Sequence, residues 1–126
     1  MSVVLLVWLT GHLVAISSVG GLRGSRQAPS YNASKAFQIN YLEALKQKAT
    51  FLNIAVSITD IRPGFVETDM AKGEGQFWVA SVNKAARQIF DAILNKKEIA
   101  YIVPERKGAM ILYNNTLYWY LKVENI

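Results

Sequence analysis

An apolar, strand-like run that ends at Ser18 most constrains this chain, because a predicted helix carrying Tyr31 and Lys35 follows it. Positions four apart lie on one face of a helix, so the Lys35 ammonium can stand beside the Tyr31 phenol and stabilise its phenolate. Tyr31 then becomes a usable proton donor or acceptor. Ser18, placed by the strand and loop before the helix, could hydrogen-bond the oxygen that gains or loses that proton. The pattern therefore predicts an acid/base site.

Three motifs in order resemble the short-chain dehydrogenase/reductase family. Residues 12–18 are similar to the strand that delivers the family's catalytic serine, and residues 31–51 are similar to its catalytic helix with the Tyr-x-x-x-Lys motif. Residues 54–61 are predicted to form the next strand. Residues 62–68 resemble the Pro-Gly-x-x-x-Thr segment that members fold over the nicotinamide end of the cofactor. A lone Tyr-x-x-x-Lys would be weak evidence, but three motifs with family-like spacing are specific.

The resemblance implies an α/β fold, part of a Rossmann-like doubly wound parallel sheet, with residues 1–126 as the C-terminal catalytic part of the domain. It also implies reversible hydride transfer between NAD or NADP and a small-molecule carbonyl or alcohol substrate. Tyr31 would pass the proton, Ser18 would polarise the carbonyl, and Lys35 would hold the nicotinamide ribose. Four further residues would seat the nicotinamide and a nearby phosphate: Pro63, Gly64, Val66 and Thr68.

The sequence departs from the family in the segment before the serine strand, where family members carry a Gly-rich phosphate-binding turn. No Gly-rich phosphate-binding turn is found, and the earliest glycine is Gly11, at the threshold of that strand. We therefore expect a truncated chain that matches the second half of the fold and lacks the N-terminal nucleotide-binding half. NAD and NADP are not distinguished, because the residues that would contact the adenosine ribose belong to that half. One alternative is a non-catalytic fragment or assembly subunit that retains the dimerisation helix. Another, an unrelated basic α/β binding module, requires the three motifs to be coincidental.

Composition limits the classes of protein and partner. The chain is 52% hydrophobic and 18% charged, as expected for a globular protein. Without cysteine it has no disulfide or thiolate metal site, which is compatible with the cytoplasmic location that we predict. Its net charge of +5 is scattered, which argues against a nucleic-acid partner. The apolar run at residues 3–9 is too short to span a bilayer, so no membrane span is expected. His12, the one histidine, is predicted at the surface with no metal site around it.

The helix that begins near Tyr31 has two apolar sides. One carries Phe37, Tyr41 and Leu45, and the other carries Ala36, Ile39 and Leu42. One side should pack on the sheet, and the other resembles the family's dimer interface, which favours a homo-oligomer formed through this helix. The alternative is that both sides are internal.

The remaining segments are given simpler roles. Ser17 is predicted to face away from Ser18, because side chains alternate along a strand. Residues 19–29 are predicted to form a loop, in which Val19 and Leu22 either line a substrate pocket or belong to an ordinary connection. Residues 69–79, with Phe77 and Trp78, either form a substrate lid or pack as an irregular connection. Residues 110–122 are expected to pack on the domain or a subunit, with a membrane-surface helix as the alternative.

A second helix is predicted at residues 83–95 and a short strand at residues 99–103. Four residues of this helix are expected to face inward: Ala86, Ile89, Phe90 and Ile93.

Overall fold

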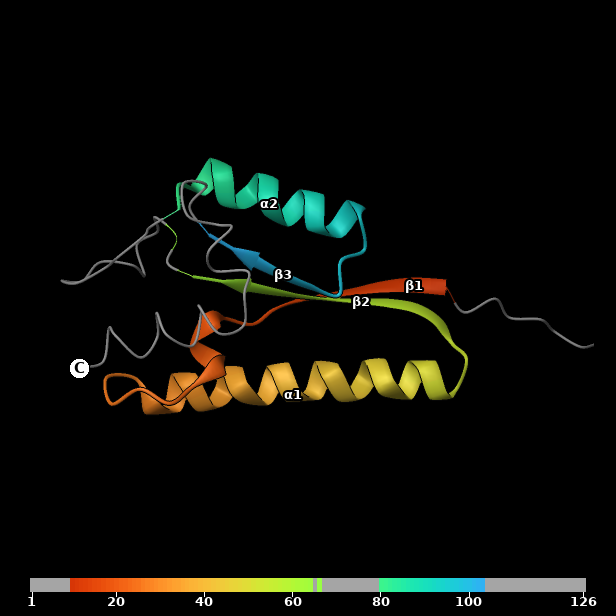
Figure 1. Cartoon of the computed structure of the whole chain (residues 1–126), viewed down its shortest axis with the longest axis horizontal. Helices are drawn as coiled ribbons and strands as arrows, with labels where there is room; N and C mark the ends of the chain where they lie inside the picture. The colour runs from red at the N-terminus through yellow and green to blue at the C-terminus, as the bar shows by residue number, and fades with distance from the viewer. Residues whose placement is uncertain (1–9, 65, 67–79, 104–126) are drawn as a thin grey trace, which may run out of the picture.

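The computed structural model describes residues 10–64, 66 and 80–103. A parallel sheet lies between two helices in this part of the chain, with α2 on one face and α1 on the other (Figure 1). The elements in chain order are strand β1 (Thr10–Ile16), 3₁₀ helix η1 (Val19–Leu22), helix α1 (Pro29–Phe51), strand β2 (Ala55–Pro63), helix α2 (Val82–Leu94) and strand β3 (Ile99–Ile102).

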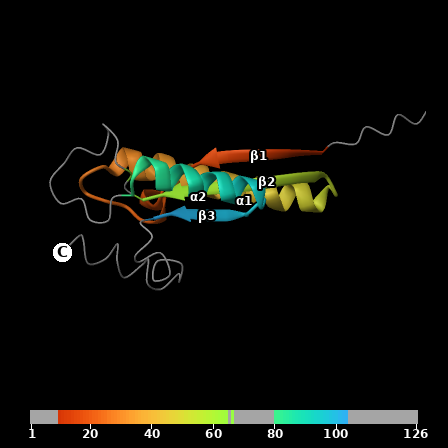
Figure 2. The same cartoon turned by 90° about the horizontal axis from the view of Figure 1, so that it is seen from above.

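The three strands are parallel and lie in the order β1-β2-β3. Ile16 pairs with Ile61, and Pro63 pairs with Ile102, so all three strands end at the same edge of the sheet (Figure 2). The helix η1 and the first turn of α1 lie at this edge (Figure 1). This arrangement confirms the expected partial Rossmann-like α/β fold.

The two strand crossovers have opposite hands. The strand order advances in one direction across the sheet, yet α1 and α2 cover opposite faces (Figure 1). Two right-handed crossovers in one direction would place both helices on the same face, so one of these two departs from the usual right-handed rule.

The apolar core of the described residues lies between the sheet and α2. Its buried members are Ile61, Ala85, Ala92, Ala100 and Ile102, and partly buried Val14, Val66 and Ile89 pack against them. Ala85 and Ala92 are two helical turns apart, and their small side chains let α2 lie close to the strands.

The prediction that Ala86 and Phe90 face inward is wrong. Both are exposed, with Phe90 at 61%. The sheet-facing side of α2 is the one that carries Ala85 and Ala92, which turns the neighbouring side with the larger phenyl ring to the surface. Ile89 does pack on the core as predicted.

Helix α1 covers the other face of the sheet. It begins at Pro29, which is favourable at the first helical position because that N–H has no intrahelical partner. Leu42 is buried on the sheet side, whereas Phe37 and Tyr41 are exposed and their rings stack with centroids 5.8 Å apart. The alternative that both sides of this helix are internal is therefore wrong within the described chain.

The predicted bounds of the strands and helices all hold to within two residues. Strand β1 begins and ends two residues earlier than predicted, which leaves Ser17 and Ser18 just beyond it. Residues 19–22, predicted as part of a loop, form η1. Residues 3–9, Thr68, residues 69–79 and residues 110–122 lie outside the described residues. Neither helix in the described ranges is long and apolar enough to cross a membrane.

Candidate functional site

Ser18 stands where the chain leaves β1 and enters η1. Its Oγ caps η1 by accepting a hydrogen bond from the Gly20 N–H at 3.0 Å, and it donates to the Pro63 carbonyl oxygen at 3.4 Å. The second distance is at the long limit for a hydrogen bond between oxygens, so this donation is weak. The Ser18 proton can therefore be redirected to another acceptor at little energetic cost, while the accepted bond holds the oxygen in place.

Tyr31, in the first turn of α1, approaches Ser18 across Gly20. A Cβ atom placed on Gly20 would lie 3.3 Å from Tyr31 Cε1 and 3.4 Å from Ser18 Oγ. The phenol ring and the hydroxyl therefore both lie beside Gly20, although different elements contribute them. A side chain at position 20 would contact both groups.

Lys35 lies one turn further along α1 than Tyr31. Its Nζ is 5.8 Å from the centre of the Tyr31 ring, within the range of a cation–π contact. The same Nζ donates to the Ile16 carbonyl oxygen and to Gln38 Oε1, each at 3.2 Å. Among the described residues, two of its three N–H donors are therefore engaged. The ammonium is held at the end of β1, near both Tyr31 and the strand that leads to Ser18.

Two residues that the sequence reasoning missed fix η1 against α1. The buried Asn32 Nδ2 donates to the carbonyl oxygens of Gly20 at 2.6 Å and Arg23 at 2.9 Å. A Cβ on Gly21 would lie only 2.7 Å from the backbone carbon of Lys35. In the sequence, Asn32 next to Tyr31 and the glycine pair at residues 20–21 are visible. The sequence does not indicate which groups these residues contact.

The residues predicted to seat the nicotinamide follow β2. The Gly64 N–H donates to the Ile102 carbonyl oxygen at 3.0 Å, and Val66 forms a parallel bridge with Ala80. A Cβ on Gly64 would meet that same oxygen at 3.6 Å, which is ordinary contact. The chain's own described atoms therefore do not require glycine here. Pro63, Gly64 and Val66 are placed at the site's edge of the sheet.

A buried polar chain crosses the sheet beside Ser18. Ser17 Oγ donates to Asp60 Oδ1 at 2.5 Å, Arg62 Nε donates to Asp60 Oδ2 at 2.6 Å, and Arg62 Nη1 donates to the Tyr101 hydroxyl at 3.2 Å. We call these four residues the polar chain. Ser17 has different side-chain partners from Ser18.

The charge of Arg62 is stabilised within the polar chain. Burial lowers the pKa of the guanidinium, but hydrogen bonding and attraction to Asp60 outweigh it, so the net shift is upward. A raised pKa contributes stability that is complete below the unfolded value and is lost as the pH rises through the folded value. Because both values are strongly alkaline, this contribution is constant across neutral pH.

The prediction that His12 is a surface residue needs correction. Its side chain is partly buried, and Nε2 lies 2.7 Å from Thr59 Oγ1, on the face of the sheet that α2 covers. Thr59 is fully buried. The neighbouring strand therefore satisfies one ring nitrogen, which the sequence could not reveal because the two residues are far apart in the chain.

The described residues fit one end of a nicotinamide cofactor. Lys35 offers an ammonium that suits ribose hydroxyls, and Gly64 presents backbone without a side chain at the same edge of the sheet. This is the edge at which parallel α/β sheets bind ligands. The sequence holds no Gly-rich turn for the pyrophosphate. These two groups are of the kind that would hold the nicotinamide and its ribose.

Comparison with known proteins assigns the family. The family model described as "short chain dehydrogenase" matches residues 6–77, which include Ser18, Tyr31 and Lys35. The chain belongs to the short-chain dehydrogenase family. The expected resemblance is confirmed.

Several curated relatives of this family align with the chain. It is 45% identical over 64 residues to a 3-oxoacyl-[acyl-carrier-protein] reductase of Chlamydia muridarum, covering 51% of this chain and 25% of the relative. It is 31% identical over 105 residues to a putative ketoacyl reductase of Streptomyces coelicolor, covering 82% and 40% respectively. It is 41% identical over 61 residues to an acetoacetyl-CoA reductase of an Acinetobacter species, covering 48% and 24%. The chain thus matches between about a quarter and two fifths of these relatives' lengths.

Proposed function

We propose that this chain is the C-terminal catalytic part of an NAD(P)-dependent oxidoreductase. It would transfer hydride between a nicotinamide cofactor and a carbonyl or alcohol. The observation that carries the proposal is that Tyr31 and Ser18 both lie beside Gly20, with the Lys35 ammonium 5.8 Å from the centre of the Tyr31 ring. Membership of a dehydrogenase family supports it. A cytoplasmic location would suit such an enzyme.

Each of the three side chains has a distinct role in this reaction. A reduced nicotinamide cofactor held by Lys35 and the residues after β2 would supply the hydride that the carbonyl carbon takes up, and would itself be oxidised. Ser18 donates a hydrogen bond to the carbonyl oxygen by releasing its long bond to Pro63. Tyr31 gives its proton to that oxygen, and the Lys35 ammonium stabilises the phenolate that remains. In alcohol oxidation the same proton moves in the reverse direction.

The relatives suggest the direction of the reaction and the type of substrate. The three relatives are named as reductases of 3-oxoacyl, ketoacyl or acetoacetyl groups. We propose that the present chain likewise takes part in reducing the ketone of an oxoacyl group. The proposal includes either nicotinamide cofactor.

The first experiment is a titration of the purified chain with NADH and NADPH, followed by coenzyme fluorescence. Saturable binding that is lost in the Tyr31→Phe/Lys35→Ala double variant would support the site. A folded chain that binds neither coenzyme would count against independent cofactor binding. If turnover of a ketone is found, Tyr31→Phe alone should reduce it by at least about a hundredfold, since general acid catalysis contributes a factor of this order.

A substitution at Gly64 should distinguish an effect on coenzyme binding from an effect on the stability of the fold. A Cβ at this position meets only ordinary contact within the described chain, so Gly64→Ala should leave the free energy of unfolding within about 0.5 kcal/mol of the parent. It should weaken coenzyme binding, because the methyl group would stand where the ring approaches. Gly24→Ala is the matched control, since no atom lies within 4 Å of its added Cβ. Unchanged coenzyme affinity in Gly64→Ala would remove Gly64 from the site.

A second candidate function is a non-catalytic assembly subunit. The exposed stack of Phe37 and Tyr41 on α1 favours it, because a paired aromatic surface is typical of interfaces. We propose that a homo-oligomer forms through this side of α1, whether or not the chain is active. Sedimentation of the chain and of Phe37→Glu tests this. An oligomer that dissociates in the variant but never binds coenzyme would favour the subunit over the enzyme.

A further inference from the structure

The polar chain includes the residues that precede the donor and the acceptor of one hydrogen bond of Ser18, the bond from its Oγ to the Pro63 carbonyl oxygen. Ser17, which donates to Asp60, immediately precedes Ser18. Arg62, which also donates to Asp60, immediately precedes Pro63, whose carbonyl oxygen accepts from Ser18 Oγ. The Asp60 carboxylate therefore links the backbone at Ser17 with the backbone at Arg62. The hydrogen bond from Ser18 to Pro63 joins the residues that follow these two.

Burial makes this tie unusually well defined. Ser17, Asp60 and Arg62 are each less than a tenth exposed. A buried ion pair gives little net stability compared with apolar packing, but it tolerates few arrangements, because each charge must keep its partners. The Ser17 N–H also donates to the Ile61 carbonyl oxygen at 2.8 Å, so β1 and β2 are joined here by backbone and side chain together.

We propose that Asp60 is a positioning residue that fixes the Ser18 hydroxyl through Ser17 and Arg62. It does not touch the reacting atoms. Its carboxylate holds the ends of β1 and β2 at the separation that lets Ser18 Oγ accept from Gly20 while its proton stays weakly bonded to Pro63. This inference rests on the proposed function for its catalytic consequence, but its structural part can be tested without any activity.

The first test measures amide hydrogen exchange by NMR in the full chain. The Gly20 N–H reports on Ser18 Oγ, because it donates to that oxygen. Ser17→Ala removes one bond to the Asp60 carboxylate and should speed Gly20 exchange by at least about tenfold, the lower end of the factor for a hydrogen bond to a charged group. Amides in the middle of α2 should be unchanged. Asp60→Asn is the second variant, and it should give a larger effect at the same amide.

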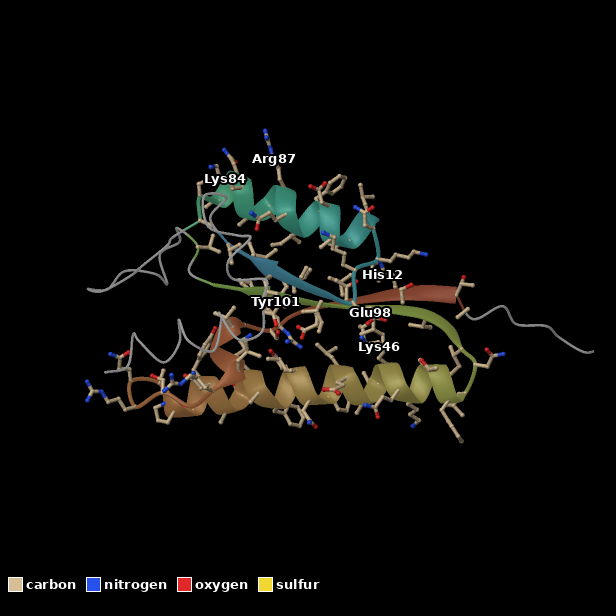
Figure 3. The ribbon with its side chains drawn as sticks, in the orientation of Figure 1. His12, Lys46, Lys84, Arg87, Glu98 and Tyr101 are labelled. Carbon is tan, nitrogen blue, oxygen red and sulfur yellow. The ribbon has the colours of Figure 1, made fainter. Side chains whose placement is uncertain are left out.

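The matched control is Lys46→Met. Lys46 pairs with Glu98 at 2.7 Å, between α1 and the start of β3 (Figure 3). The substitution removes this side-chain pair and leaves the backbone bond from the Asp60 N–H to the Glu98 carbonyl oxygen in place. This variant should leave Gly20 exchange unchanged. The proposal is overturned if Gly20 exchange in folded Ser17→Ala equals that of the parent. It is equally overturned if exchange rises by the same factor throughout the chain, because that would be general destabilisation.

The second test is kinetic and uses coenzyme-dependent ketone reduction. Ser17→Ala should lower kcat about tenfold with little change in KM, because it misplaces a group that acts in the transition state. Combined with Ser18→Ala it should cost nothing more than Ser18→Ala alone, because residues that act as a unit are not additive. Additive losses would overturn the assignment. A parent chain without activity would count against the oxidoreductase, and the exchange result would still decide the positioning role.

Discussion

The two crossovers of this chain are built by different physical means. The first, from β1 through η1 and α1 to β2, is held at its functional end by directed polar bonds and by close backbone approach at Gly21. The second, through α2 to β3, is held by small apolar side chains around Ala85 and Ala92, with one side-chain amide, Gln88, at its end. All three predicted catalytic residues belong to the first.

Directed polar bonds in the first crossover and apolar packing in the second differ in how much movement they allow. Apolar packing around α2 tolerates small shifts, because it depends on area and volume rather than on direction. Bonds from Asn32 to two carbonyl oxygens do not tolerate such shifts. The proposed acid/base chemistry needs Ser18 and Tyr31 at a fixed separation, and directed contacts are the kind of interaction that can fix one. Substitutions in the first crossover should therefore affect the site more than equivalent ones in the second.

The largest effect is expected for Gly21→Ala. The added Cβ would lie 2.7 Å from the Lys35 backbone carbon and 2.9 Å from the Ala36 backbone nitrogen, so η1 must move away from α1. We expect a loss of about 3 kcal/mol in the free energy of unfolding, at the upper end of overpacking penalties. Chemical denaturation followed by circular dichroism measures it.

Gly24→Ala is the control in the same loop, where the new methyl group meets no atom within 4 Å. It should be neutral within about 0.5 kcal/mol. Equal losses in the two variants would mean that the loop is sensitive to any added side chain. The close approach at Gly21 would then have no special part in holding η1.

An intermediate effect is expected for Asn32→Ala, and Gln88→Ala is its counterpart in the second crossover. Asn32 donates twice to backbone carbonyls, and Gln88 bonds both the N–H and the carbonyl oxygen of Val103. Each variant leaves two backbone groups without their partner and should cost about 1–3 kcal/mol. Thermal unfolding of both variants provides the comparison.

The two amides should differ in their effect on function. Of these two amides, Asn32 is the one that donates to the Gly20 carbonyl oxygen, and the Gly20 N–H in turn donates to Ser18 Oγ. Asn32→Ala should therefore weaken coenzyme binding or turnover, whereas Gln88→Ala should leave both close to the parent values. Similar functional losses in the two variants would show that general stability, rather than the η1 contacts, governs the site.

The sequence predicted the elements of both crossovers but not the contacts between them. Strand and helix periodicities are local, so α1 and the strands were placed to within a few residues, and the spacing of Tyr31 and Lys35 predicted their common face. The link from Asp60 to Ser17 joins positions far apart in the chain, which no local pattern records. The predicted orientation of α2 is wrong at Ala86 and Phe90, because the helical spacing of apolar residues fits their side of the helix as well as the side with Ala85 and Ala92 that packs on the sheet.

The smallest effect is expected for the ion pair between Lys46 and Glu98, which connects α1 with the start of β3 (Figure 3). Its side chains are 32% and 71% exposed, so water and salt screen the attraction. Lys46→Met should change the free energy of unfolding by less than about 0.5 kcal/mol. Any difference between parent and variant at low salt should shrink further at high salt. A loss as large as that of Asn32→Ala would contradict the comparison, because a screened contact remote from Ser18 would then match the directed bonds that hold η1.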